Sequence, residues 1–406
     1  MSPAALLLAA VVAPPAGIVV LPPTGPGGSA PGWIGAAVEE TLPRALQRAG
    51  VRALASSDRR RVLEALGIPG PVASHATGVR IAEAVGARQL VFGSWDLAGT
   101  ELTITLRPFD TGTAALGPEL KAGGPLDSVG RLIEELARNL AGATAPPGRE
   151  ELVVTAAAVP FAALRALGEA LIARDAETRI KGLRRALAVH PRYPDATLVL
   201  ARLLYDTGRY AEAREALAAL APGPPFGREA RFLEGACLLG LGRAEEADVL
   251  YAELAAQDAT AGVLANRGVA RLRLMPAASG ASTLVRQALD RSPYAADLPF
   301  DLGWALLMEG DLEGAVTWLR TAVRYAPSDA KARIALSWAL RRSNHAEEAD
   351  EQWRAAAALD PSLEAQRLGS PAQRLERVLP SEAALVIDAA RAQDARAEGR
   401  RGNGRR

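Results

Sequence analysis

The sequence predicts a small α/β domain with a mixed sheet over residues 17–145, followed by an all-α superhelical solenoid over residues 160–363. Two observations support this division. Prolines in the second half of the chain recur with a period of 34 residues, which is typical of a repeated helical hairpin. Between residues 89 and 110, apolar and polar residues alternate with the period of a half-buried β-strand.

Three kinds of residue set the register of the repeats. Proline stops a second helix and begins the next unit, at Pro191, Pro225, Pro293, Pro327 and Pro361. A small residue allows two helices to approach closely, at Ala213, Ala247, Ala281, Ala315 and Ala349. A turn residue lies between the two helices, at Gly208, Gly242, Pro276, Gly310 and Asn344. Glycine and asparagine suit this place because the residue that ends a helix often has left-handed backbone angles.

The repeated unit resembles the tetratricopeptide repeat. Its best copy, within residues 296–329, reads LGWALLMEGDLEGAVTWLRTAVRYAP and has Leu302-Gly303, Ala315, Leu319, Ala322 and Pro327 where the family pattern places them. The resemblance gives six repeats, at 160–193, 194–227, 228–261, 262–295, 296–329 and 330–363. The first repeat departs at Arg179 and the fourth at Pro276. Because each repeat mainly contacts its neighbours, residues 150–406 are expected to fold without the α/β domain.

The α/β domain is predicted as a strand at 18–21, a helix at 33–49, a strand at 51–55, helices at 58–66 and 77–85, a hairpin turning at Ala98-Gly99, and a helix at 126–141. The strings GIVVLPP at 17–23 and GARQLVFGSWDLAGTELTITLRPFDTGTA at 86–114 resemble the TolB amino-terminal-like domain, related in style to the FlgO-type domain of bacterial envelope proteins. Asp110-Thr111-Gly112 is shorter than the corresponding turn of that family. The resemblance implies no catalytic residues.

The two ends of the chain carry different signals. Residues 1–16 form a leader or signal-like segment, with the apolar run AALLLAAVVA but no basic residue before it. A secretory signal would place the protein in the periplasm or outside the cell, and a plain leader would leave it in the cytoplasm; both interpretations stay open. The run is too short to span a membrane. Residues 364–398 are predicted to be a capping helical segment, and residues 399–406 a basic disordered tail.

Composition argues against several classes of function. The 47 basic and 46 acidic residues nearly balance, so no nucleic-acid partner is expected. One cysteine and three scattered histidines suggest no metal site. The loop GPGGSAPG at 25–32 lacks the Gly-Lys-Ser/Thr of a phosphate-binding loop. We therefore expect no catalytic residues, no cofactor-binding residues and no enzymatic activity.

The leading hypothesis is a non-enzymatic scaffold that binds a partner peptide or protein in the concave groove of the repeats, in a bacterial envelope or signalling assembly. The alternative is a small-ligand sensor, in which the α/β domain binds the ligand and the repeats transmit the signal. A polar pocket in residues 17–142 would favour the sensor, and an apolar groove would favour the scaffold. The sequence names neither the partner nor the oligomeric state.

The resemblance to the tetratricopeptide repeat also implies which first-helix positions face the groove. Transferred to this sequence, they are Arg202, Tyr205, Phe232, Asn266, Arg273, Phe300, Trp304, Met308, Lys331, Ile334, Trp338, Arg341 and Arg342. Aromatic residues and arginine are the types enriched at binding hot spots. For Trp304 and Trp338, packing between repeats is an equal alternative to recognition.

Overall fold

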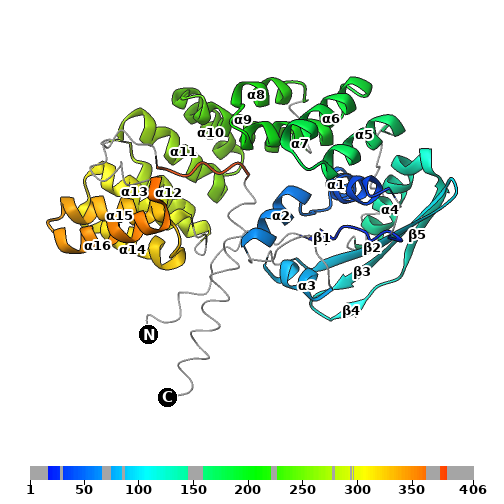
Figure 1. Cartoon of the computed structure of the whole chain (residues 1–406), viewed down its shortest axis with the longest axis horizontal. Coiled ribbons are helices and arrows are strands. Elements are labelled where there is room, and N and C mark those ends of the chain that lie inside the picture. The colour runs from blue at the N-terminus through cyan, green and yellow to red at the C-terminus, as the bar shows by residue number, and fades with distance from the viewer. Residues whose placement is uncertain are drawn as a thin grey trace, which may run out of the picture. The chain divides into compact units, whose positions relative to one another are not determined.

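The computed structural model describes residues 17–27, 31–65, 75–84, 87–144, 159–220, 226–276, 279–292, 295, 297–362 and 375–381. The predicted leader and the basic tail lie outside these residues. The described chain divides into two compact units, here called the N-terminal unit, which ends at Cys237, and the C-terminal unit, which begins at Leu238. A small mixed sheet is followed by paired helices of a solenoid, so the predicted fold class is confirmed (Figure 1).

The sheet is mixed because one parallel pair joins an antiparallel meander. Strand β1 (Ile18–Val20) runs parallel to β2 (Gln89–Ala98), and β3 (Glu101–Asp110) runs antiparallel to β2. The short strands β4 (Ala115–Leu116) and β5 (Leu120–Pro125) both pair antiparallel with β3. The hairpin turns at Gly99, which has a φ of +65°. A glycine carries no Cβ penalty at such an angle, which explains the predicted turn.

Two features of the sheet differ from the prediction. Residues 51–55 do not form a strand and make only one bridge, between Ile18 and Ala53. The bridge consists of two backbone hydrogen bonds, from the Ile18 amide to the Arg52 carbonyl oxygen and from the Leu54 amide to the Ile18 carbonyl oxygen, and helix α2 then begins at Ser56. Strand β5 was not anticipated, because its sequence LKAGGP contains no β-branched or aromatic residue. Strand β5 forms because it pairs with β3, although its own residues have low β-propensity.

Helices α1 to α7 of the N-terminal unit have these bounds: α1 (Trp33–Arg48), α2 (Ser56–Ala65), α3 (His75–Ala84), α4 (Val129–Thr144), α5 (Phe161–Ile172), α6 (Ala176–Val189) and α7 (Pro194–Asp206). Helix α8 (Tyr210–Leu217) completes the second pair, and a 3-10 turn at Leu126–Ser128 precedes α4. Helix α9 (Gly227–Gly240) spans the boundary between the two units.

The C-terminal unit continues the pairs with α10 (Ala244–Gln257), α11 (Ala261–Leu274), α12 (Ala281–Arg291), α13 (Leu298–Glu309), α14 (Leu312–Tyr325), α15 (Ala330–Arg342) and α16 (Ala346–Leu359). Within the described residues, no helix is both long and apolar enough to cross a membrane.

The turns and seams of the pairs follow the predicted chemistry. Four of the five predicted turn residues have left-handed angles, with φ between +66° and +93°: Gly208, Gly242, Gly310 and Asn344. The small alanines are all buried to 1% exposure or less: Ala213, Ala247, Ala281, Ala315 and Ala349. Between α13 and α14, a Cβ on Gly303 would lie only 2.6 Å from a carbon of Leu319. Close approach of the two helices therefore depends on small residues at the seam.

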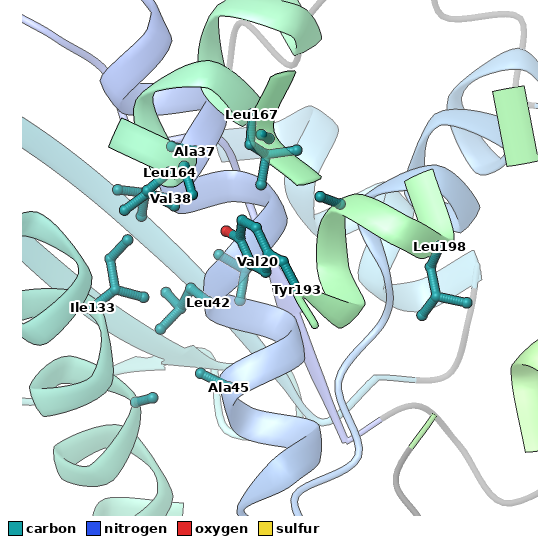
Figure 2. Close-up of a cluster of buried hydrophobic side chains, with 14 of the residues drawn as sticks. Val20, Ala37, Val38, Leu42, Ala45, Ile133, Leu164, Leu167, Tyr193 and Leu198 are labelled. Atoms are coloured by element: carbon teal, nitrogen blue, oxygen red, sulfur yellow. The ribbon is translucent and has the colours of Figure 1, made fainter. Parts of the chain in front are cut away.

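The α/β domain and the first repeat helices share one hydrophobic core. In Figure 2, side chains of α1 such as Val38 and Leu42 lie between Ile133 of α4 and Leu164 of α5. Tyr193, at the start of α7, is 1% exposed and belongs to the same cluster. The independent folding of residues 150–406 stays a prediction, and the first repeat buries apolar surface against α1 as well as against other repeats.

The contact between α5 and α1 gives the first testable prediction. A Cβ on Gly168 of α5 would lie 2.4 Å from the backbone oxygen of Trp33 in α1. Gly168→Ala should therefore destabilise the protein by about 1–3 kcal/mol through overpacking. The measurement is urea denaturation followed by circular dichroism.

Gly142, in α4, is the matched control for this substitution. A Cβ there would meet nothing within 4 Å. Gly142→Ala should be neutral or should stabilise the protein by up to about 1 kcal/mol, because alanine is the better helix former. Equal effects of the two alanine substitutions would show that α5 does not pack closely on α1.

Candidate functional site

An extended segment of the C-terminal unit, residues 375–381, lies against three first helices, α11, α13 and α15. It is the dark-red trace beside α11 in Figure 1. We call these residues, which read LERVLPS, the C-terminal segment. The side chains that hold it form what we call the α11–α15 face: Asn266, Arg273, Asp297, Phe300, Asp301 and Asp329.

Asn266 of α11 binds the backbone of the segment at Leu379. Its Nδ2 donates to the carbonyl oxygen of Leu379, and its Oδ1 accepts from the Leu379 amide, each at 2.8 Å. Nδ2 also donates to the hydroxyl of Tyr251, at 2.8 Å, which orients the amide. Asn266 and Tyr251 are both fully buried. A side-chain amide that satisfies both backbone groups of one residue recognises extended chain, whatever side chain that residue carries.

Arg377 contacts four side chains of the α11–α15 face. Its guanidinium donates to the carboxylates of Asp297 and Asp329 and lies over the ring of Phe300, with 4.4 Å between the Arg377 Cζ and the ring centroid. Its backbone amide donates to Oδ1 of Asp301 at 2.9 Å. Charge-assisted hydrogen bonds and a cation over an aromatic ring are both favourable to arginine.

Glu376, the preceding residue, meets the opposite charge. It forms an ion pair with Arg273 of α11. The side chains of Arg273 and Glu376 are only 10% and 4% exposed. Arg273 is fixed from behind, because its Nη1 donates to the carbonyl oxygen of Leu239 at 2.6 Å. The face thus presents a cationic site and an anionic site to two consecutive residues of the segment.

Asp301 has an unusual ionisation. Burial raises the pKa of the Asp301 carboxyl to about 8. The hydrogen bond from the Arg377 amide and the charge of Arg273 lower this pKa, whereas the charge of Glu376 raises it. A protonated Asp301 at neutral pH leaves the carboxylates of Asp297 and Asp329 as the counter-charges of Arg377.

The described part of the expected capping helix is not helical. Residues 375–381 contain no helix, and their backbone groups at Arg377 and Leu379 bond to side chains of the repeats. Pro380 follows directly, and proline disfavours a helical conformation in the residue before it. The remainder of the predicted helix, residues 364–374 and 382–398, lies outside the described residues.

The groove-facing residues that the tetratricopeptide-repeat resemblance implied make different contacts within the C-terminal unit. Asn266, Arg273 and Phe300 contact the C-terminal segment. Trp304 and Trp338 pack on each other, with ring centroids 5.8 Å apart and exposures of 2% and 9%. These two rings therefore pack between α13 and α15, and a role for them in recognising a partner stays a prediction.

The other transferred residues of the C-terminal unit differ in burial and contact other groups. Ile334 is fully buried, Met308 is half-buried and Lys331 is exposed. Arg341 forms an ion pair with Asp350, and Arg342 donates to the carbonyl oxygen of Leu307 at 3.0 Å.

Asp297, Asp301 and Asp329 were missed by sequence reasoning. They lie at or near the starts of α13 and α15, and Asp329 also caps α15 through the Ala332 amide. Asp297 lies 34 residues before Lys331, at the same position of its repeat, but was not among the residues singled out. The available signal was the pairing of Asp297 and Asp301 one turn apart beside Phe300.

The three transferred residues of the N-terminal unit lie elsewhere. Phe232 is buried in the core at 1% exposure, and Tyr205 packs edge-on against Tyr210 with ring centroids 5.3 Å apart. Arg202 lines a cavity of about 400 Å³ beneath α1. The charged residues that line this cavity are four arginines and three acidic residues: Arg44, Arg60, Arg179, Arg202, Glu40, Asp206 and Glu229.

Cys237 and the possible metal ligands are the other reactive groups of the described residues. Cys237 is fully buried, and burial raises the pKa of its thiol to about 12, which disfavours the nucleophilic thiolate. Among the described residues, no group of three or more His, Cys, Asp or Glu side chains is placed to hold a metal ion.

Comparison with known proteins identifies the class of the helical part. Models of the tetratricopeptide repeat match residues 175–226 and 278–330, one segment in each unit. No curated protein sequence matches the chain. The chain therefore carries tetratricopeptide repeats in these two segments, and an α/β domain precedes them.

Several solved structures resemble parts of the chain. One is MamA from Desulfovibrio magneticus RS-1, 18% identical over 42% of this chain and 97% of that one, with a TM-score of 0.37. Another is YrrB, described as a TPR protein with an unusual peptide-binding site, 16% identical over 47% of this chain and 97% of that one, with a TM-score of 0.36. A third is the APC/C hetero-tetramer Cut9-Hcn1, 15% identical over 52% of this chain and 43% of that one, with a TM-score of 0.44.

Proposed function

We propose that this protein is a non-enzymatic interaction scaffold whose α11–α15 face binds an extended segment of a partner protein. One observation carries the proposal: Asn266 holds an extended chain by both backbone groups of Leu379. Such a contact is typical of a surface that binds peptides, because the donors and acceptors of the backbone are common to all of them. The flanking charged sites then supply selectivity.

The experiment is capture of partners by the full chain and by two variants. Residues 375–381 use the same two hydrogen bonds, so the comparison is made in a chain that carries Arg377→Asp, which disfavours their binding beside Asp297 and Asp329. In that chain, Asn266→Ala removes both hydrogen bonds to a bound partner backbone and should reduce partner capture about 5- to 150-fold, since two buried hydrogen bonds are worth about 1–3 kcal/mol together. Lys331→Ala changes an exposed residue of α15 and should leave capture unchanged. Circular dichroism must first show that both variants are folded.

A partner held equally well by Asn266→Ala would contradict the proposal. The small-ligand sensor is the second candidate, and it rests on the charged cavity beneath α1. In that cavity Arg44 is already paired with Glu229, whereas Arg60 and Arg179 remain as candidate contacts for an anionic ligand. The sensor gives Asn266 no role, so the capture experiment separates the two functions.

The cellular setting of this function follows only from the resemblances in the sequence. We propose that the α/β domain is of the TolB amino-terminal-like type and that the protein acts in the periplasm or another part of a bacterial envelope. The strand order β1, β2, β3 and the hairpin at Gly99 are compatible with that proposal. A cytoplasmic signalling assembly is the alternative, and fractionation of cells that express the tagged full chain decides between them.

A further inference from the structure

We propose that the C-terminal segment is an intramolecular peptide ligand: it occupies the α11–α15 face in the free protein, and a peptide with the pattern Glu-Arg-x-Leu displaces it. The occupation of the face by the protein's own segment does not depend on the proposed function. Only the statement that a partner supplies the displacing peptide rests on it.

The register of the segment is fixed at two points of its backbone. Leu379 is held by Asn266 through both its amide and its carbonyl, and the Arg377 amide donates to Asp301. With these bonds in place, Asn266 and Phe300 are fully buried and Asp301 is 2% exposed. A second peptide cannot reach the polar side-chain atoms of Asn266 and Asp301 unless the C-terminal segment leaves.

The side chains make the occupancy selective. Arg377 meets Asp297 and Asp329, while Glu376 meets Arg273. A peptide with these two charges exchanged would place a carboxylate against carboxylates and a guanidinium against Arg273. Like charges brought together in a partly desolvated site are strongly unfavourable. Leu379, at 4% exposure, adds an apolar anchor two residues after the arginine.

The segment competes as a tethered ligand. It is joined to the end of α16 through residues 363–374. A ligand on a tether of this length has an effective concentration on the order of 1 mM. A free peptide with a Kd of about 10–100 μM would then bind about 10- to 100-fold more weakly to the unmodified chain than to a chain with a disabled segment.

The experiment measures binding of a fluorescent peptide, LERVLPS, to the full chain by anisotropy. In Arg377→Asp the segment would place a carboxylate beside Asp297 and Asp329, so the face should open. This variant should bind the peptide about 10- to 100-fold more tightly than the unmodified chain. Arg377→Lys keeps the charge and should stay close to the unmodified chain. The charge-exchanged peptide LREVLPS should bind none of the three.

Two results would overturn the proposal. One is equal affinity of the peptide, or no affinity, for the unmodified chain and Arg377→Asp. The other is a dimer that dissociates on Arg377→Asp, because the segment would then occupy the face of a second copy. Light scattering at several protein concentrations tests the latter.

Hydrogen exchange on the unmodified chain is an independent measurement that needs no variant. The amides of Arg377 and Leu379 donate to side chains of the face and should exchange slowly. Exchange at the rate of an unstructured peptide would also overturn the proposal.

Failure of this proposal and failure of the proposed function give different results. If Arg377→Asp gains affinity for the peptide but no partner depends on Asn266, the intramolecular ligand stands and the scaffold function fails. If a partner depends on Asn266 but Arg377→Asp changes nothing, the scaffold function stands and the intramolecular ligand fails.

Discussion

Replacing Trp304 by alanine should lower the free energy of unfolding by about 3–5 kcal/mol. Trp304 is 2% exposed, and its ring lies 5.8 Å from that of Trp338 in the next first helix. Removing the indole therefore leaves a cavity between α13 and α15, in addition to the lost burial of a large apolar side chain. Urea denaturation of the full chain, followed by circular dichroism at 222 nm, measures the change.

Lys331→Ala, at an exposed position of α15, is the control and should change the free energy of unfolding by less than about 0.5 kcal/mol. A Trp304→Ala protein with unchanged stability but lost partner capture would return Trp304 to the recognition surface. The structure argues against that outcome, because recognition requires an accessible ring.

Replacing Arg44 by alanine should destabilise the N-terminal unit by about 2–4 kcal/mol, near the range for breaking a buried ion pair. The Arg44 side chain is 3% exposed and forms a two-fold hydrogen bond with Glu229, at 2.5 and 3.0 Å. Its guanidinium also lies over the ring of Phe226, with 5.6 Å between Cζ and the ring centroid. The substitution removes a link between α1 of the α/β domain and α9 of the third helical pair. The combined substitution Arg44→Met with Glu229→Leu should recover most of the loss.

The effect of Arg44→Ala should depend on pH. Burial raises the pKa of Glu229, but Arg44 lowers it by charge and hydrogen bonding, so the net shift in the intact protein is downward. The contribution of this pair is therefore present above the ordinary pKa of a glutamate and is lost as the pH falls through the lowered value.

In the variant, the two lowering effects of Arg44 are gone and only the charge of Arg202 still opposes burial, so the pKa of Glu229 should rise. The folded variant then takes up a proton more readily than the unfolded chain, so it gains stability as the pH falls from 7 toward 4. The difference in stability between the two proteins should shrink over that interval. A constant difference would show that Glu229 does not respond to Arg44.

The helical half of the fold could be predicted because its rules are local. The left-handed turns at Gly208 and Asn344 and the buried seam at Ala315 depend on residue size and backbone freedom, which a single sequence displays. The hairpin at Gly99 was predicted for the same reason. Strand β5 was not, since its LKAGGP sequence pairs only because β3 lies beside it.

The candidate site was predicted only in part. Asn266, Arg273 and Phe300 lie at first-helix positions that the resemblance to the tetratricopeptide repeat implied would face the groove. Asp297 and Asp329 acquire their role from a segment almost fifty residues or more farther along the chain, and no local pattern connects them with Arg377.

The sequence by itself determined the period of the helices, the residues that turn them and the class of the repeats, because each of these follows from steric demands within one helical pair. Tertiary structure alone decided two things. It joined the first repeat to the α/β domain through α1, where Gly168 lies against Trp33. It also placed residues 375–381 on α11, α13 and α15, where charges distant in sequence compensate one another. Burial and ion pairing act between whichever groups the folded chain brings together, and a linear pattern does not contain that information.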